Sequence, residues 1–154
     1  MLLVWIGIGL GTWPVNFATA GQQVNWPVVG PVVSEFDPPD PDWLPGHRGV
    51  DLAAAAGTQV RTPREGIVVF AGPVAGVPVV VVRHGTARAT YQPVTSAVSV
   101  GWPVAAGELL GVTEGLGGHC AGRCLHWGLK INDRYADPRL LLGAVKVVLA
   151  PTND

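Results

Sequence analysis

The chain has 154 residues, of which 48% are hydrophobic and 14% charged, so it can bury a real core as one domain, and disorder is not expected outside its ends. Its 21 glycines and 14 prolines are scattered rather than periodic, which excludes a collagen-like chain and favours many short strands joined by turns. The formal net charge of -1 offers no electrostatic attraction for nucleic acid or an anionic membrane, and we expect neither as a partner.

The first 20 residues differ from the rest because they are mostly apolar and contain no Lys or Arg. Ala18, Thr19 and Ala20 precede Gly21 and match the small-x-small pattern at which signal peptidases cleave. Pro14 interrupts the apolar run, which disfavours a membrane span of about 20 residues. We therefore expect residues 1–20 to be a signal peptide, although the usual basic start is missing. An uncleaved anchor, or an apolar element packed on the domain, are the alternatives.

The next segment begins with a broken apolar stretch at 25–33, which predicts a first strand. Residues 34–46 are rich in Pro and Asp, and proline excludes both helix and sheet interior there. This loop is either the wall of a substrate groove or a solvated connector.

The middle of the chain contains short apolar runs bounded by glycine and proline. These predict strands at 59–62, 66–71, 77–84, 88–92, 97–100 and 125–131. The run at 79–82 is all valine, so we expect that strand to be covered on both faces. Four alanines at 53–56 favour helix locally, but the run is too short to be helical alone.

The C-terminal part begins with a hairpin-type turn at Asn132 and Asp133. Asp137 followed by Pro138 predicts a helix of one or two turns over 139–142, with proline at its first position. Residues 143–154 are expected to be a tail or a last strand. The predicted fold class is therefore all-β, with an antiparallel β-sheet core.

The two cysteines, Cys120 and Cys124, are separated by three residues. Outside the cytoplasm such a pair is expected to form a short disulfide. So small a loop adds little through chain entropy, and its main effect is to fix the backbone just before His126.

Three potential metal ligands occur in two distant segments. His47 and Asp51 are four residues apart, and His126 lies in the strand predicted at 125–131. Two imidazole nitrogens and one carboxylate oxygen form a three-ligand set for zinc that leaves a fourth position for water. Such a site can polarise a carbonyl and supply hydroxide near neutral pH.

A rival interpretation combines His119, Cys120, Cys124 and His126 into a closed structural zinc site. Adjacent ligands point apart in most backbones, and an exported chain would oxidise the two thiols. We therefore favour the open site.

An ordered series of short motifs identifies a family resemblance that covers residues 26–142. The motifs are Gly46-His47-Arg48-Gly49-Val50-Asp51-Leu52, Ala56-Gly57-Thr58, Val81-Val82-Arg83-His84-Gly85, Thr90-Tyr91 and Leu125-His126-Trp127. In this order they resemble the lysostaphin-like, LytM-type zinc endopeptidases. The resemblance implies an antiparallel fold of the duplicated hybrid motif type, with a groove over a zinc site. It also implies cleavage of peptide cross-links in bacterial peptidoglycan, and hence a secreted or cell-envelope location.

The resemblance assigns the zinc ligands to His47, Asp51 and His126. It also shows two departures, because the family has two further histidines that act in proton transfer and oxyanion stabilisation. Those positions are Pro93 and Cys124 here. Losing a general acid or base typically costs about 10²–10⁴ in rate, and losing an oxyanion donor about 10²–10³.

Two residues are candidates for the missing catalytic groups. His119 would be tied near the metal by a Cys120–Cys124 disulfide, where its imidazole could transfer protons; otherwise it is a solvated loop histidine. Tyr91 could donate a hydrogen bond to a tetrahedral intermediate, or it only packs. His84 is expected to be structural.

Three hypotheses follow. The first is an exported zinc metalloendopeptidase of reduced rate, acting as a monomer on peptidoglycan peptides. The second is a catalytically degenerate domain that binds cell wall or regulates a partner cell-wall hydrolase. The third is a β-domain whose metal only stabilises the fold.

Overall fold

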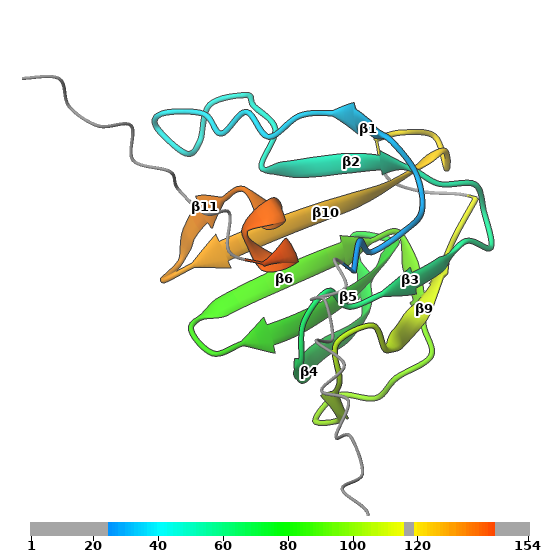
Figure 1. The fold of residues 1–154 in the computed structure, drawn as a ribbon. Helices are drawn as coiled ribbons and strands as arrows, with labels where there is room; N and C mark the ends of the chain where they lie inside the picture. The colour runs from blue at the N-terminus through cyan, green and yellow to red at the C-terminus, as the bar shows by residue number, and fades with distance from the viewer. Residues whose placement is uncertain (1–24, 116–118, 144–154) are drawn as a thin grey trace, which may run out of the picture.

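The computed structural model describes residues 25–115 and 119–143, and Figure 1 shows an antiparallel β-protein. The all-β class and the antiparallel core predicted from the sequence are confirmed. The predictions for residues 1–20, and for the tail from 144 onwards, lie outside the described residues. No helix in the described part of the chain is long and apolar enough to span a membrane.

Two sheets make up the fold. The large sheet has the strand order β1-β2-β10-β6-β5-β4-β8, with β11 paired to β10, and the small sheet has the order β3-β9-β7. The elements are β1 (Val32–Ser34), β2 (Gly49–Ala53), β3 (Gln59–Arg61), β4 (Gly66–Val74), β5 (Val77–His84), β6 (Ala87–Gln92), β7 (Val94–Ser96), β8 (Pro103–Val104), β9 (Leu109–Thr113), β10 (Cys124–Ile131), β11 (Arg134–Ala136) and the 3₁₀ helix η1 (Pro138–Leu142). In Figure 1, β2, β10, β6 and β5 lie side by side, and their registers place the residues discussed below.

The core covers one face of the large sheet. Because side chains alternate along a strand, Trp127 and Leu129 of β10 point into the core and are at most 2% exposed. Val60 of β3, Leu110 of β9 and Leu141 of η1 belong to the same core cluster, so the small sheet and η1 lie over this face. The residues between the core positions point to the opposite face, which we call the outer face.

One predicted strand needs correction, and the alanine run at 53–56 is not helical, in line with its short length. Residues 97–100 are not a strand, because Ser96 accepts a hydrogen bond from the Val98 amide (3.1 Å) and donates one to the Val98 carbonyl (2.7 Å), which closes a local turn. The alanine run begins inside β2, where Ala53 pairs with Cys124 of β10. Pairing within the sheet overrides the local preference of alanine for helix.

The valine strand differs from expectation at one position. Val79, Val80 and Val82 are buried as predicted, but Val81 is only half-buried because it lies on the outer face. Coverage on both faces is therefore incomplete.

The C-terminal turns follow the sequence prediction. Asn132 and Asp133 have φ angles of 49° and 65°, which suit the tight hairpin between β10 and β11. Asp137 caps η1 by accepting a hydrogen bond from the Arg139 amide at 2.9 Å, and Pro138 is the first helical residue.

Candidate metal centre

Strand pairing brings the three predicted ligands to one place on the outer face. Asp51 of β2 lies directly opposite His126 of β10 in the antiparallel register. His47 lies four residues before Asp51 in an extended segment, and its amide and carbonyl form hydrogen bonds of 2.7 Å and 2.9 Å with the backbone of Asp37. The Pro- and Asp-rich loop therefore holds His47 just before the start of β2.

The ligand atoms converge closely. His47 Nε2 is 3.1 Å from Asp51 Oδ1 and 3.2 Å from His126 Nδ1, and His126 Nδ1 is 2.8 Å from Asp51 Oδ1. A tetrahedral zinc ion with ligands at about 2.0–2.1 Å separates neighbouring ligand atoms by about 3.3 Å. The observed separations, together with the two-nitrogen, one-oxygen donor set, fit zinc.

The other nitrogen of His47 is also fixed. Its Nδ1 lies 2.5 Å from the Glu35 carbonyl oxygen and 3.3 Å from Ser34 Oγ. A bond from Nδ1–H to this carbonyl leaves the Nε2 lone pair free for a metal, as in many metal sites where outer groups orient a histidine. No residue pattern predicts this contact, because a backbone carbonyl carries no residue signature.

Gly49 provides the space for the His126 ring. A Cβ atom added to Gly49 would lie 2.5 Å from the Trp127 carbonyl oxygen and 2.7 Å from His126 Cε1. Real Cβ atoms are almost never so close to other atoms, so any side chain here would displace the imidazole or separate β2 from β10.

Asp51 is the centre of the cluster and is 2% exposed. Burial by itself would raise the pKa of Asp51, but hydrogen bonds from His126 and His119, and the charge on those imidazoles, outweigh burial and lower this pKa to about 2. The carboxylate is therefore ionised, as a metal ligand must be, throughout the physiological range.

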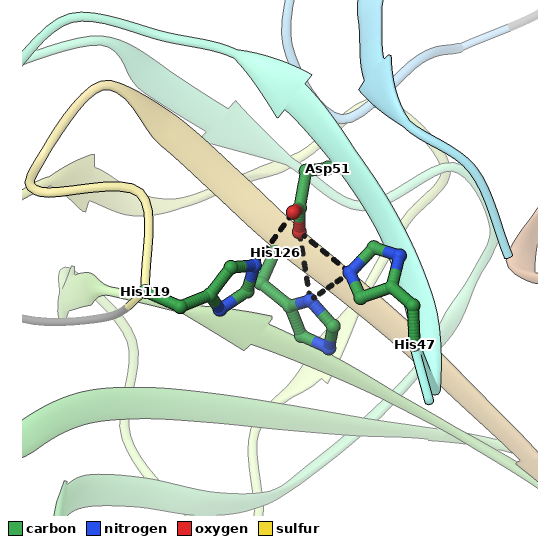
Figure 2. A group of neighbouring side chains, drawn as sticks. All are labelled: His47, Asp51, His119 and His126. Carbon is green, nitrogen blue, oxygen red and sulfur yellow. Dashed lines mark hydrogen bonds and ion pairs between the residues drawn. The ribbon is translucent and has the colours of Figure 1, made fainter. Parts of the chain in front are cut away.

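A third histidine, the fourth residue of the cluster, completes the group shown in Figure 2. His119 Nε2 lies 2.6 Å from Asp51 Oδ2, on the side of the carboxylate away from His47. The centroid of the His119 ring lies 5.6 Å from the centroid of the His47 ring and 5.2 Å from that of the His126 ring. The ligand atoms of all four residues lie within 4.8 Å of one another. His119 is the most open member, with half of its side chain exposed.

The predicted disulfide is present and explains the position of His119. Cys120 and Cys124 are bonded, with their Cα atoms 5.6 Å apart. Cys124 lies on β10 two residues before His126, and therefore on the same face of the sheet. Through this bond the strand holds the segment that carries His119 over Asp51. The oxidised sulfurs are not thiolates, so they do not supply the closed zinc site of the rival interpretation.

The structure does not bring Tyr91 into the cluster. Its side chain is completely buried in the core, on the opposite face of β6 from the metal ligands, and its hydroxyl has no hydrogen-bond partner within the described ranges. Burial raises the pKa of this hydroxyl far above its ordinary value. Tyr91 therefore packs in the core, which corrects its prediction as a donor to a tetrahedral intermediate.

The two positions without the expected histidines are also closed to chemistry. Pro93 is buried after β6, and Cys124 is 4% exposed and bonded to Cys120. Neither has a group that can bind or release a proton. His47, Asp51 and His126 are the three predicted ligands. Among the described residues, the remaining imidazole in the cluster is that of His119.

The antiparallel sheets with a cluster of potential metal ligands on the outer face define a protein of the lysostaphin-like fold. Residues 45–138 match Peptidase family M23, and the chain belongs to this family.

The chain is 42% identical over 141 residues to the protein named Uncharacterized protein Rv2891 of Mycobacterium tuberculosis, a match that covers 86% of this chain and 57% of that protein. It thus spans little more than half the length of the curated relatives that it matches. The crystal structure of a putative peptidase M23 from Pseudomonas aeruginosa has a TM-score of 0.65 and 29% identity, covering 80% of this chain and 52% of that one. The solution structure of lysostaphin has a TM-score of 0.65 at 24% identity, covering 87% and 62% of the two chains, which shows a shared fold.

Proposed function

We propose that the chain is an exported, zinc-dependent peptide hydrolase that cleaves peptide cross-links of bacterial peptidoglycan. The observation that carries this proposal is the convergence of His47 Nε2, Asp51 Oδ1 and His126 Nδ1 within 2.8–3.2 Å of one another. Membership of a peptidase family supports peptide hydrolysis. The disulfide beside the ligands supports an oxidising, extracytoplasmic location.

Zinc bound by these three residues would polarise the substrate carbonyl and lower the pKa of a coordinated water. The chain itself fixes the geometry, because β2 and β10 hold two ligands in register and the Glu35 carbonyl orients the third. The rigid sheet keeps these ligands in place as substrate binds.

His119 is proposed to replace the missing family imidazole as the proton-transfer group. Its Nε2 contacts Asp51 Oδ2, whereas the other two histidines contact Oδ1, so it lies beside the ligand set rather than within it. Its exposed side would meet an incoming peptide. As an imidazole it can take a proton from the attacking water and return it to the leaving amine.

The direct test is digestion of purified peptidoglycan by the zinc-loaded chain, with release of new amine termini as the readout. We expect release by the native chain and none after His126→Ala, which removes a ligand. His119→Ala should lower the rate by about 10²–10⁴ while zinc stays bound at one ion per chain. If the zinc affinity falls instead, His119 is a fourth ligand. No amine release at high concentration of a zinc-loaded, folded chain would refute the proposal.

A second candidate is a degenerate domain that binds cell wall or regulates another hydrolase, and the observation that favours it is the inert pair at positions 93 and 124. It predicts that the zinc-loaded chain co-sediments with peptidoglycan without releasing amines. It also predicts that Cys124→His combined with Pro93→His creates activity. If the metal has a purely structural role, its removal should lower the thermal stability of the protein and leave cell-wall binding unchanged.

A further inference from the structure

The outer face continues beyond the metal ligands along three neighbouring strands. Starting from His126, every second residue of β10 points to this face, and β6 and β5 supply the residues opposite. The first row next to the ligands is formed by Gly128, Thr90 and Val81, and the following row by Lys130, Arg88 and Arg83.

The first row forms a low floor. Gly128 has no side chain, and a Cβ added there would be in ordinary van der Waals contact with the Arg48 carbonyl oxygen at 3.5 Å and His126 Nε2 at 3.7 Å, so the floor here is the backbone itself. Thr90 and Val81 are half-buried. Together with Val69 and Phe70 of β4 and the three cations, they line a groove of about 530 Å³. None of the three first-row residues has a side chain larger than valine or threonine, which leaves room for an extended peptide between the ligands and the second row.

The second row concentrates positive charge. Arg88 pairs directly with Lys130 on one side and with Arg83 on the other, so three cationic side chains lie across adjacent strands. Like charges in directly opposite positions destabilise a sheet. In a chain whose net charge is -1, this arrangement is a local cost that a bound anion would offset.

Little of this charge is neutralised within the molecule. Arg88 forms an ion pair with Asp133, whose side chain is 81% exposed. The Lys130 ammonium lies 4.4 Å from the centre of the Tyr135 ring, a contact that positions a cation without cancelling its charge. In residues 25–115 and 119–143, neither Lys130 nor Arg83 has a carboxylate partner.

We infer that Lys130, Arg88 and Arg83 form a subsite for a carboxylate of the substrate, so that the chain selects acidic peptides over uncharged ones. Lys130 is four residues from His126 on the same strand, a separation of about 13 Å. The carboxylate, whether from a side chain or a free C-terminus, would therefore lie about three to four residues from the bond placed at the metal. This inference names the substrate class of the proposed hydrolase and rests on that function.

The test uses synthetic peptide pairs that differ only by Glu or Gln at one position, moved stepwise away from the scissile bond. We expect the native chain to prefer the Glu peptide by about 10-fold in kcat/KM, mainly through KM, when Glu lies three or four residues away. In Arg83→Gln combined with Lys130→Gln, the preference should fall to about 2-fold or less. Arg61→Gln, on the small sheet, is the control for general loss of charge, and this variant should keep the preference for the Glu peptide. Raising the salt concentration should weaken the preference in the native chain.

Binding of the same peptides to zinc-loaded chain carrying His119→Ala, measured by calorimetry, separates this inference from the proposed function. A Glu preference in binding that disappears in the charge variant supports the subsite even if no peptide is cleaved. Equal binding of Glu and Gln peptides at every position, or a preference unchanged in a folded charge variant, would overturn it.

Discussion

The low pKa of Asp51 predicts how the stability of the metal-free protein depends on pH. The folded value of about 2 lies below the ordinary value of 3.8, so unfolding favours protonation of this carboxyl. Its contribution is therefore fully present above pH 3.8 and is lost as the pH falls through about 2. The difference between the two values corresponds to about 2 kcal/mol of unfolding free energy. Solvent screening does not reduce this figure appreciably, because the side chain is only 3% exposed.

Urea denaturation of the metal-free protein at several pH values between about 5 and 2 measures this contribution. Other carboxyl groups titrate in the same range, so Asp51→Asn is the matched control, since it keeps the shape and removes the titration. Between about pH 5 and pH 2 the native chain should lose about 2 kcal/mol more than the variant. Parallel curves for the two proteins would show that the imidazoles do not stabilise the Asp51 carboxylate, and our account of the site's electrostatics would be wrong.

Three other perturbations have defined outcomes. Gly49→Ala should lower the unfolding free energy by about 1–3 kcal/mol and weaken zinc binding in a competition titration with a chelator, because the new Cβ meets β10 and His126. Gly72→Ala, whose Cβ would have its nearest neighbour at 3.7 Å, is the control, and equal effects of the two changes would contradict the steric argument. Tyr91→Phe should leave peptide cleavage within about twofold and not reduce stability, because it removes a buried hydroxyl that has no partner in the described part of the chain; a large loss of activity would return Tyr91 to the site. Burial lowers the pKa of His84 despite the hydrogen bond between its ring and the Glu65 carbonyl, so the NMR titration midpoint of His84 should lie below 6.5. The stability that the neutral ring contributes is present above pH 6.5 and should be lost as the pH falls through that midpoint. A midpoint above 6.5 would show that the ring is more open to solvent than the structure indicates.

The sequence determined which residues can form the candidate metal centre. Which residues carry ligand atoms is a local property, and so is the alternation that distinguishes the two faces of a strand such as β10. The cysteine spacing predicted a disulfide beside His126, and a proline after Asp137 predicted the short helix, because each depends on neighbours within a few residues.

The tertiary structure decided how those residues meet. Strand register depends on pairing between segments far apart in the chain, so only the folded sheet shows Asp51 opposite His126, Tyr91 inside the core, and a row of three cations across β10, β6 and β5. The position of His119 depends on the same register, since the disulfide that holds it over Asp51 is anchored on β10. A shift of one residue in the pairing of β10 with β2 would place His126 and Asp51 on opposite faces of the sheet, and no local sequence pattern specifies this register.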